Sequence, residues 1–311
     1  MRHGRYPFVA GFLVVPVVLY AVFVISPYAQ TFFYSFTDWR GVSNRINLVG
    51  FDNYVALLND DVFRRALGHN GVLLLVLPLV TIVLALFLAF MLNVGGRGNR
   101  ASVVGVRGAA FYKVVYFFPV VLSVAILAVL WQAVYRGDQG GLLNGLLMKL
   151  RIVDEQRPWA FVASPAWVLW CVIAVLVWAG VGFYLVLFST AMQSIPRDLF
   201  EAAILDGASR GQTFFRVTLP LVWDNIQVAW VYLAIAAMDA FALVYILTPA
   251  SGGGGGGPDH ASEVVGTHLY RTAFFFGRTG YACAMGVTVF FITLLLAILA
   301  LRLTRRERIE L

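Results

Sequence analysis

Residues Gly71–Leu92 read GVLLLVLPLVTIVLALFLAFML and contain no charged side chain. About 20 apolar residues in a helix cross the hydrocarbon core of a bilayer, and lipid offers the backbone no other hydrogen-bonding partner. Other stretches share this character, so the sequence predicts an all-α membrane protein with six transmembrane helices. The predicted spans lie near Phe8–Phe33, Gly71–Leu92, Val114–Val134, Ala166–Phe188, Ile226–Leu247 and Tyr281–Leu301.

Composition supports the membrane class. The 311 residues are 60% hydrophobic and 13% charged, which is far more apolar surface than a soluble domain uses. The net charge of +7 comes from Arg residues beside apolar runs rather than from one basic patch. This distribution is typical of residues that orient membrane spans and not of a nucleic-acid-binding surface. Cys171 and Cys283 lie inside apolar runs and are expected to be packing thiols. The four histidines lack metal-ligand spacing, so no metal site is expected.

The chain has no recognisable ATP site. A Walker A loop needs G-x-x-x-x-G-K-[ST], because its Lys reaches the phosphates. The two lysines, Lys113 and Lys149, do not follow a glycine. The glycine run Gly252–Gly257 is therefore expected to be a flexible turn without chemistry. No catalytic or cofactor-binding residue is predicted here, and any ATP hydrolysis must occur on another chain.

Positive residues orient the predicted spans. The segment between the second and third spans carries Arg97, Arg100, Arg107 and Lys113 and no Asp or Glu. Because Lys and Arg accumulate on the cytoplasmic side, both termini and residues 201–220 are predicted to be cytoplasmic. The first apolar stretch exceeds the roughly 7–15 residues of a signal peptide and lacks a small-x-small cleavage site, so we expect it to remain as a span.

A polar, glycine-broken segment, EAAILDGASRGQTFFRVTLP, separates the fourth and fifth predicted spans at Glu201–Pro220. It predicts a short helix after Pro196, with a slim alanine face, and then a backbone reversal at Gly207 that a side chain would resist. A second helix is expected over about residues 210–218, and Pro220 limits how far it continues. Without its flanking residues, the segment would fit an ordinary amphipathic loop between spans equally well.

The segment resembles the cytoplasmic coupling loop of ABC importer permeases. That loop carries E-A-A, three residues, Gly, nine residues and then Ile-x-Leu-Pro; here Val217 stands where Ile is usual, and the left flank Gln193–Leu199 also matches. In the family this helix–turn–helix docks in a groove on the ATPase subunit. The resemblance therefore implies a set of ATPase-coupling residues, namely Glu201, Ala202, Ala203, Asp206, Gly207, Val217, Leu219 and Pro220.

The resemblance extends along the chain to the maltose- and glycerol-phosphate-type carbohydrate permeases of binding-protein-dependent importers. The matching segments include Ser35–Trp39, Val49–Tyr54, Gly182-Phe183, the Leu247-Thr248 turn stretched by extra glycines, and Gly280–Ala282. The resemblance implies a type I ABC importer permease fold in the bacterial cytoplasmic membrane. It also implies a second homologous permease subunit, an ABC ATPase dimer that binds Mg-ATP, an extracytoplasmic solute-binding protein and a carbohydrate substrate.

These inferences divide the chain by topology. Residues 1–70 are expected to form the first transmembrane helix and an external loop, residues 71–303 the core permease domain, and residues 304–311 a cytoplasmic tail. The coupling loop occupies residues 193–222 within the core. In the external loop before the fourth span, Gly141–Leu147 is expected to lie at the membrane interface as a short amphipathic helix.

One acid lies deep inside a predicted span. A charge at mid-membrane costs roughly 3 kcal/mol, so Asp239 should face a partner or a wet cavity. Tyr232 shares its helix face two turns earlier, and an acid with an aromatic ring suits sugar hydroxyls and a pyranose ring. The alternative is that Asp239 pairs with the second permease subunit and aids assembly. Trp178 and Tyr184 are further candidates for the substrate path, although span aromatics are more often packing or interface anchors.

Three other functions compete with sugar import. The same architecture would serve glycerol phosphodiesters or polyols, but no basic residue lies in the apolar cores of the spans, which favours a neutral sugar. An ion-coupled secondary transporter would show intramembrane charge relays and inverted repeats, and neither is evident. A structural membrane scaffold would explain six spans but not the coupling motif.

Overall fold

The computed structural model describes residues 5–43, 45–94, 106–249 and 254–303. Within these ranges every regular element is a helix, apart from two isolated bridged pairs, Thr37 with Leu48 and Pro249 with Gly255. Four described helices are long and apolar enough to cross a membrane, and two bent pairs pass the same test when each pair is counted as one span. The predicted all-α fold is confirmed, with four to six candidate spans.

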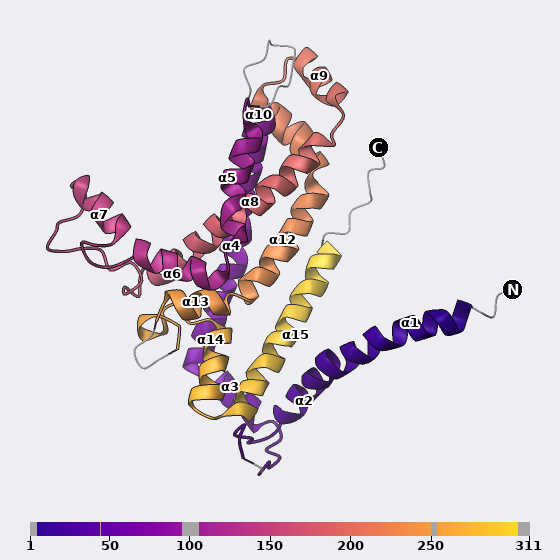
Figure 1. Cartoon of the computed structure of the whole chain (residues 1–311), viewed down its shortest axis with the longest axis vertical. Coiled ribbons are helices and arrows are strands. Elements are labelled where there is room, and N and C mark those ends of the chain that lie inside the picture. Colours follow the sequence, from indigo (N-terminus) through magenta and orange to yellow (C-terminus); the bar gives the residue numbers. More distant parts are fainter. Residues whose placement is uncertain (1–4, 44, 95–105, 250–253, 304–311) are drawn as a thin grey trace. The chain divides into compact units, whose positions relative to one another are not determined.

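Backbone contacts group the chain into two compact units, residues 1–64 with 268–296 and residues 65–267 with 297–311. The elements of the first unit (Figure 1) are α1 (Arg5–Tyr20), the π-helical turn η1 (Ala21–Ile25), α2 (Ser26–Tyr34), α3 (Asp52–Leu58), the π-helical turn η4 (Arg271–Phe275) and most of α15 (Thr279–Leu303). Those of the second unit are α4 (Asp61–Val94), which begins in the first unit, α5 (Ala109–Val121), α6 (Val124–Val134), α7 (Leu142–Lys149), α8 (Val168–Gln193), α9 (Arg197–Leu205), α10 (Arg210–Thr213), the π-helical turn η2 (Phe214–Thr218), α11 (Leu219–Leu221), α12 (Trp223–Met238), α13 (Phe241–Leu247), η3 (Pro258–His260) and α14 (Val265–Tyr270), whose last residues belong to the first unit.

In the first unit, α2 and the chain that follows it pack on α15. The ring of Phe32 meets the rings of Phe290 and Phe291 edge-on, at centroid distances of 5.9 and 5.8 Å. The N–H of Gly280 donates to the carbonyl of Trp39 at 2.8 Å. Together these contacts fix the end of α2 against the start of α15.

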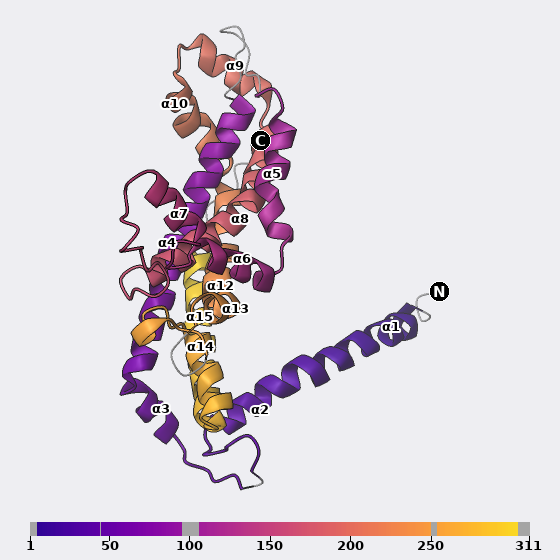
Figure 2. The ribbon, with the colours of Figure 1, turned by 60° about the vertical axis from the view of Figure 1, so that its left-hand side comes forward.

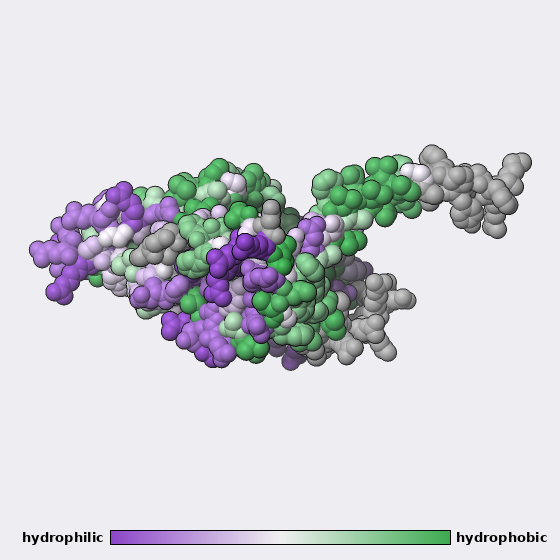
Figure 3. Space-filling model, turned by 90° about the horizontal axis from the view of Figure 1, so that it is seen from below, coloured by the Kyte–Doolittle hydropathy of each residue, from purple (hydrophilic) through white to green (hydrophobic). Residues whose placement is uncertain are grey.

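The helix formed by α1, η1 and α2 keeps an apolar surface. Phe12, Val15, Leu19 and Phe23 are each more than half exposed, and Figure 3 shows the coloured part of this N-terminal helix largely in green, the colour of hydrophobic residues. A contiguous apolar surface of this size marks a membrane or protein interaction site. It is what a span presents to lipid or to another transmembrane subunit.

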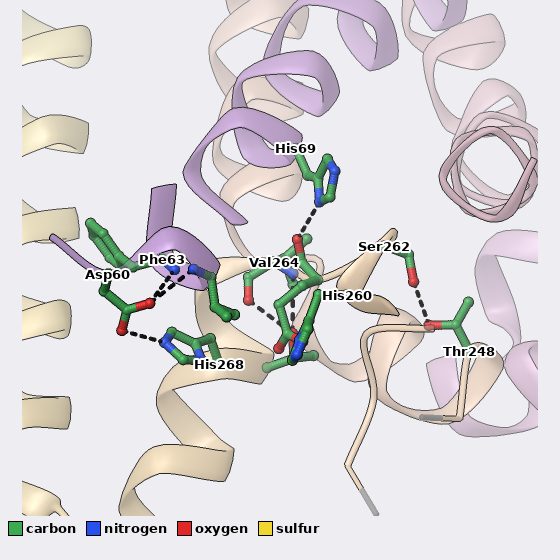
Figure 4. A network of polar contacts seen from close by, with 11 residues as sticks. Asp60, Phe63, His69, Thr248, His260, Ser262, Val264 and His268 are labelled. Carbon is green, nitrogen blue, oxygen red and sulfur yellow. Dashed lines mark hydrogen bonds and ion pairs between the residues drawn. The ribbon is translucent and has the colours of Figure 1, made fainter. Parts of the chain in front are cut away.

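A carboxylate holds the start of α4. One oxygen of Asp60 accepts the backbone N–H groups of Val62 and Phe63 at 2.9 and 3.0 Å. Its other oxygen accepts the hydroxyl of Tyr281 at 2.8 Å and lies 3.2 Å from Nε2 of His268 (Figure 4). Partial burial acts to raise the pKa of Asp60, but these hydrogen bonds to the charged form outweigh it and hold the pKa below its usual value.

The core of the second unit centres on α8, where Phe188, Leu185 and Val172 are fully buried. At Gly182 the backbone of α8 meets the backbone of α5 directly. A Cβ at Gly182 would lie only 1.9 Å from the carbonyl oxygen of Tyr116. Only glycine permits this approach of the two helices.

The third predicted span is not one helix. The sequence predicted a continuous helix over Val114–Val134, and this is wrong: α5 ends at Val121, and α6 departs from it at 101°. Pro119 lacks an N–H and so weakens the end of α5. Leu122 and Ser123 are extended, and the Ser123 hydroxyl caps α6 by accepting the N–H of Ile126.

The fifth predicted span, Ile226–Leu247, is also interrupted. The helix α12 ends at Met238 and α13 starts at Phe241, so Asp239 lies in the break. A second bend, of 71°, falls at Val222 between α11 and α12. The two short helices α6 and α13 lie side by side (Figure 2), and the Gln132 amide donates to the carbonyl of Ile246.

We expect Gly182→Val to destabilise the protein by about 2 kcal/mol or more, because its side chain must displace the backbone of α5. Gly180→Ala is the matched control, since its added methyl would make only ordinary contacts at 3.9 and 4.0 Å. The measurement is the apparent melting temperature of the purified protein in mild detergent. Equal melting temperatures for the two variants would contradict the close approach of α5 and α8.

We expect Asp60→Asn to lower stability by about 1–2 kcal/mol at pH 7, because the amide cannot accept at both positions. The pKa of Asp60 is lowered in the folded state, so its stabilising contribution is present above the unfolded value of about 4 and is lost as the pH falls through the lowered folded value. The difference in melting temperature between wild type and variant should therefore be full at pH 7 and narrow below about pH 4. A difference that does not depend on pH would contradict the role of the charge.

Candidate functional site

The polar segment after α8 forms a tight helix–glycine–helix turn. Gly207 has a φ of +77°, the left-handed conformation that favours glycine. Its N–H donates to the carbonyl of Ile204 at 3.0 Å, and the N–H of Ala208 donates to that of Ala203 at 2.9 Å. These two bonds are the Schellman arrangement that closes the end of α9. The backbone reversal expected at Gly207 is present.

A reciprocal cap starts the next helix two residues later. The Ser209 hydroxyl accepts the N–H of Gln212, and the Gln212 side chain accepts the N–H of Ser209 at 2.7 Å. Helix α10 continues through the π-helical turn η2, where the N–H of Leu219 donates to Phe214. Pro220 lies in α11, which ends one residue later at Leu221. The helix expected over residues 210–218 is present as α10 and η2.

The first half of the motif faces outward. Glu201, Ala202 and Asp206 are exposed, and Ala203 is half-buried. Leu205, which the sequence did not single out, is 87% exposed. A large apolar side chain beside exposed carboxylates on a short helix is a surface suited to another protein.

The second half of the motif anchors the loop. Phe214 packs on Phe90 of α4 with ring centroids 4.9 Å apart, and the buried Thr218 hydroxyl donates to the carbonyl of Thr213. Val217 and Leu219 are half-buried. Phe200 on α9 is buried and belongs to the same hydrophobic core. The turn is therefore packed on α4 through Phe214 and on the hydrophobic core through Phe200.

The four candidate path residues occupy different environments. Asp239 is exposed in the break after α12, and not inside a continuous helix. Tyr232 on α12 is 63% exposed, whereas Tyr184 on α8 is buried. Trp178 on α8 is 41% exposed and meets Trp131 edge-on at 5.4 Å. The four residues therefore share no single environment, and Trp178 is the one placed in an aromatic contact with a neighbouring helix.

The prediction of a flexible glycine turn is wrong for Gly255, Gly256 and Gly257, which are buried. The N–H groups of Gly256 and Gly257 both donate to the carbonyl of Thr248, at 3.1 and 3.0 Å. A Cβ at Gly255 would lie 2.2 Å from the Cα of Tyr245. Close backbone packing, and not flexibility, requires these glycines. The preceding residues 250–253 lie outside the described part of the chain.

Sequence reasoning missed a buried polar cluster beside this turn. Glu263 is fully buried, and its carboxylate lies 2.8 Å from Nδ1 of His260. Nδ1 of His69 lies 2.8 Å from the backbone carbonyl of Glu263 (Figure 4). Asn70, one residue further on, donates to the carbonyl of Ala237 and accepts the N–H of Val265 at 2.9 Å. The signal available in the sequence was a His-Asn pair directly before the apolar run of α4.

Neither this buried cluster nor the hydrogen bonds around Asp60 resemble a metal centre. Across the described ranges, no group of three or more His, Cys, Asp or Glu side chains is placed to hold a metal ion. The polar groups instead satisfy backbone donors and acceptors at helix ends.

Comparison with known proteins places the chain in a family. Residues 54–309 match the model of the binding-protein-dependent transport system inner membrane component. The chain is 40% identical over 305 residues to the diacetylchitobiose uptake system permease protein NgcF of Streptomyces coelicolor, covering 98% of this chain and 84% of that protein. It is 32% identical over 299 residues to the multiple sugar-binding transport system permease protein MsmF of Streptococcus mutans, covering 95% and 94%.

Solved structures agree on the fold. A chain of a bacterial ABC transporter involved in the import of the acidic polysaccharide alginate superposes with a TM-score of 0.79 at 22% identity, covering 97% of this chain and 96% of that one. The helix–glycine–helix turn, the apolar spans and the family match over most of the chain agree with one another. The chain belongs to the binding-protein-dependent transport system inner membrane component family, the membrane-spanning permeases of ABC transporters.

Proposed function

We propose that this chain is a permease subunit of an ATP-driven, binding-protein-dependent sugar importer in the bacterial cytoplasmic membrane. The observation that carries the proposal is the exposed α9 face, with Glu201, Ala202 and Leu205, held on a turn that Phe214 packs against α4. The names of the relatives NgcF and MsmF, both sugar permeases, support sugar as the cargo.

The proposed topology has six spans and cytoplasmic termini. In this scheme the bent pair of α5 and α6 counts as one span. The fifth span begins with α12, and α10 and α11 stay on the cytoplasmic side as part of the coupling loop. Arg107 and Lys113 flank the start of α5, and Arg197, Arg210 and Arg216 lie on the coupling turn, so the positive residues favour the same side for both.

Coupling is proposed to run through the Glu201–Pro220 loop. Glu201 and Asp206 offer carboxylates to the ATPase subunit, while Ala202 and Ala203 leave room for its close approach. Because the turn is capped on both sides of Gly207, a docked ATPase would move it as one piece. Mg-ATP would bind to the ATPase dimer, and no cofactor is assigned to this chain.

The remaining partners follow from the same scheme. A second homologous permease subunit would cover part of the apolar surface of the spans, and an extracytoplasmic solute-binding protein would deliver the sugar. The alginate importer has been solved with an alginate-bound periplasmic protein. In this chain Asp239 and Tyr232 are both exposed near the end of α12, which suits hydrogen bonding and ring stacking with a neutral mono- or oligosaccharide.

Purification of the tagged full chain from its native membrane tests the function, with Gly207→Ala as the diagnostic variant. We expect an ATPase, a second permease and a solute-binding protein to co-purify with the wild type. An alanine at φ +77° costs about 1–2 kcal/mol, so Gly207→Ala should reduce ATPase recovery and binding-protein-stimulated sugar uptake in proteoliposomes.

Gly211→Ala is the matched control, because a Cβ meets nothing at either glycine and only Gly207 has a positive φ. Gly211→Ala should keep both ATPase recovery and uptake near the wild-type level. If both variants lost activity equally, a steric contact and not the backbone reversal would be responsible. If no ATPase came with the wild-type chain after gentle cross-linking, the importer proposal would be wrong.

A substitution at Asp239 distinguishes a role in sugar binding from a role in assembly with the partner permease. If Asp239 accepts hydrogen bonds from the sugar, Asp239→Asn should raise the KM of uptake about tenfold, equivalent to about 1.4 kcal/mol, while the partner permease still co-purifies. Asp224→Asn, at the opposite end of α12, is the control with the same chemistry and should leave KM unchanged. Loss of the partner permease with Asp239→Asn would instead support the assembly role.

A further inference from the structure

The connection between α2 and α4 exposes an apolar stripe. Leu48 and Phe51, just before α3, and Val55 and Leu58, within it, are 73%, 70%, 57% and 74% exposed. We call these four residues the α3 stripe. Large apolar side chains exposed together in this way mark an interaction surface.

The rest of the helix surface divides by chemistry. Asp52, Ala56 and Asn59 are also exposed, and they follow one another at helical spacing on a second line of the surface. With about 100° between successive residues, this polar line lies about a quarter turn from the stripe. The exposed surface of α3 is therefore amphipathic, with separate apolar and polar arcs.

Hydrogen bonds prevent α3 from rolling over to hide the stripe. The Asn53 amide donates to the carbonyls of Ser35 and Thr37, both at 2.9 Å, and the Tyr54 hydroxyl donates to the Ser35 hydroxyl at 2.7 Å. Leu57 is buried on the same inward face. The stripe is thus held outward by contacts within the first unit.

The position of α3 in the chain puts it at the edge of the membrane. The helix α2 ends at Tyr34 and α4 begins at Asp61, and both belong to candidate spans. Trp39 stacks on Tyr34 with ring centroids 4.2 Å apart. Trp and Tyr concentrate where a span meets the headgroup region, so this pair marks the boundary at the end of α2, where Ser35 and Thr37 accept the hydrogen bonds of α3.

We propose that α3 lies in the interfacial layer of the bilayer, with the α3 stripe among the upper acyl chains and the line of Asp52, Ala56 and Asn59 toward water. A helix in the plane of the interface presents this combination of an apolar and a polar arc. A soluble partner that binds only transiently would leave four large apolar side chains in water for most of the cycle, so lipid is the better occupant. The proposal goes beyond sugar import, since it needs only that α2 and α4 cross the membrane.

The test uses pairs of adjacent residues on α3 in the full-length protein. Single cysteines replace Val55 or Leu58 on the stripe, and Ala56 or Asn59 on the polar line, in a Cys171→Ala, Cys283→Ala background. Each is labelled with bimane and reconstituted into phosphatidylcholine–phosphatidylglycerol vesicles. Bimane quenching is then measured with nitroxide-labelled phosphatidylcholine in both leaflets and, separately, with iodide on both sides of the membrane.

We expect the lipid quencher to act at least threefold more strongly at Val55→Cys and Leu58→Cys than at Ala56→Cys and Asn59→Cys, and iodide to show the reverse order. Equal quenching at all four positions would overturn the proposal. The proposal would also be overturned if iodide quenched the stripe positions strongly and a solute-binding protein then reduced that quenching. The stripe would in that case be a protein-docking surface. A failure of sugar uptake alone would bear on the proposed function and not on this placement.

Discussion

The direct contact between the backbones of α5 and α8 at Gly182 is the constraint on which the second unit depends. Because no side chain separates the two helices, α5 ends in a fixed place against the core. The 101° bend then sets the direction of α6, and the amide of Gln132 ties α6 to α13. A continuous series of contacts therefore leads from Gly182 on α8 through α5 and α6 to α13, which begins after the break where Asp239 lies.

Helix breaks leave backbone groups that lipid cannot satisfy, and at three of the described helix ends another group of the chain satisfies them. Ser123 caps the first turn of α6. Asn70 donates to the carbonyl of Ala237 in the last turn of α12, and the carbonyl of Thr248 accepts two glycine N–H groups after α13. The polar residues at these breaks therefore serve the backbone at helix ends.

The sequence predicted the parts of the structure that local signals determine. The reversal at Gly207 was predicted correctly because a glycine with φ near +77° and a following Ser-x-x-Gln cap act within a few residues. The break after Pro119 was not predicted, because proline does not interrupt the helix at Pro16 in α1 or at Pro78 in α4. Packing with distant residues decides between these outcomes, and the glycines at Gly255–Gly257 likewise depend on Tyr245 and Glu263.

The coupling loop and Asp239 lie at opposite ends of the same run of helix, from α10 to α12. The loop is capped on both sides of Gly207 and packed on α4 through Phe214, so it has few internal degrees of freedom to absorb a displacement. The bend at Val222, whose side chain is buried, is likewise held by the core. In the proposed importer, a force applied to α9 would therefore be transmitted along α12 to the break at Asp239 rather than dissipated in the loop, because rigid packed elements carry coupling between distant sites.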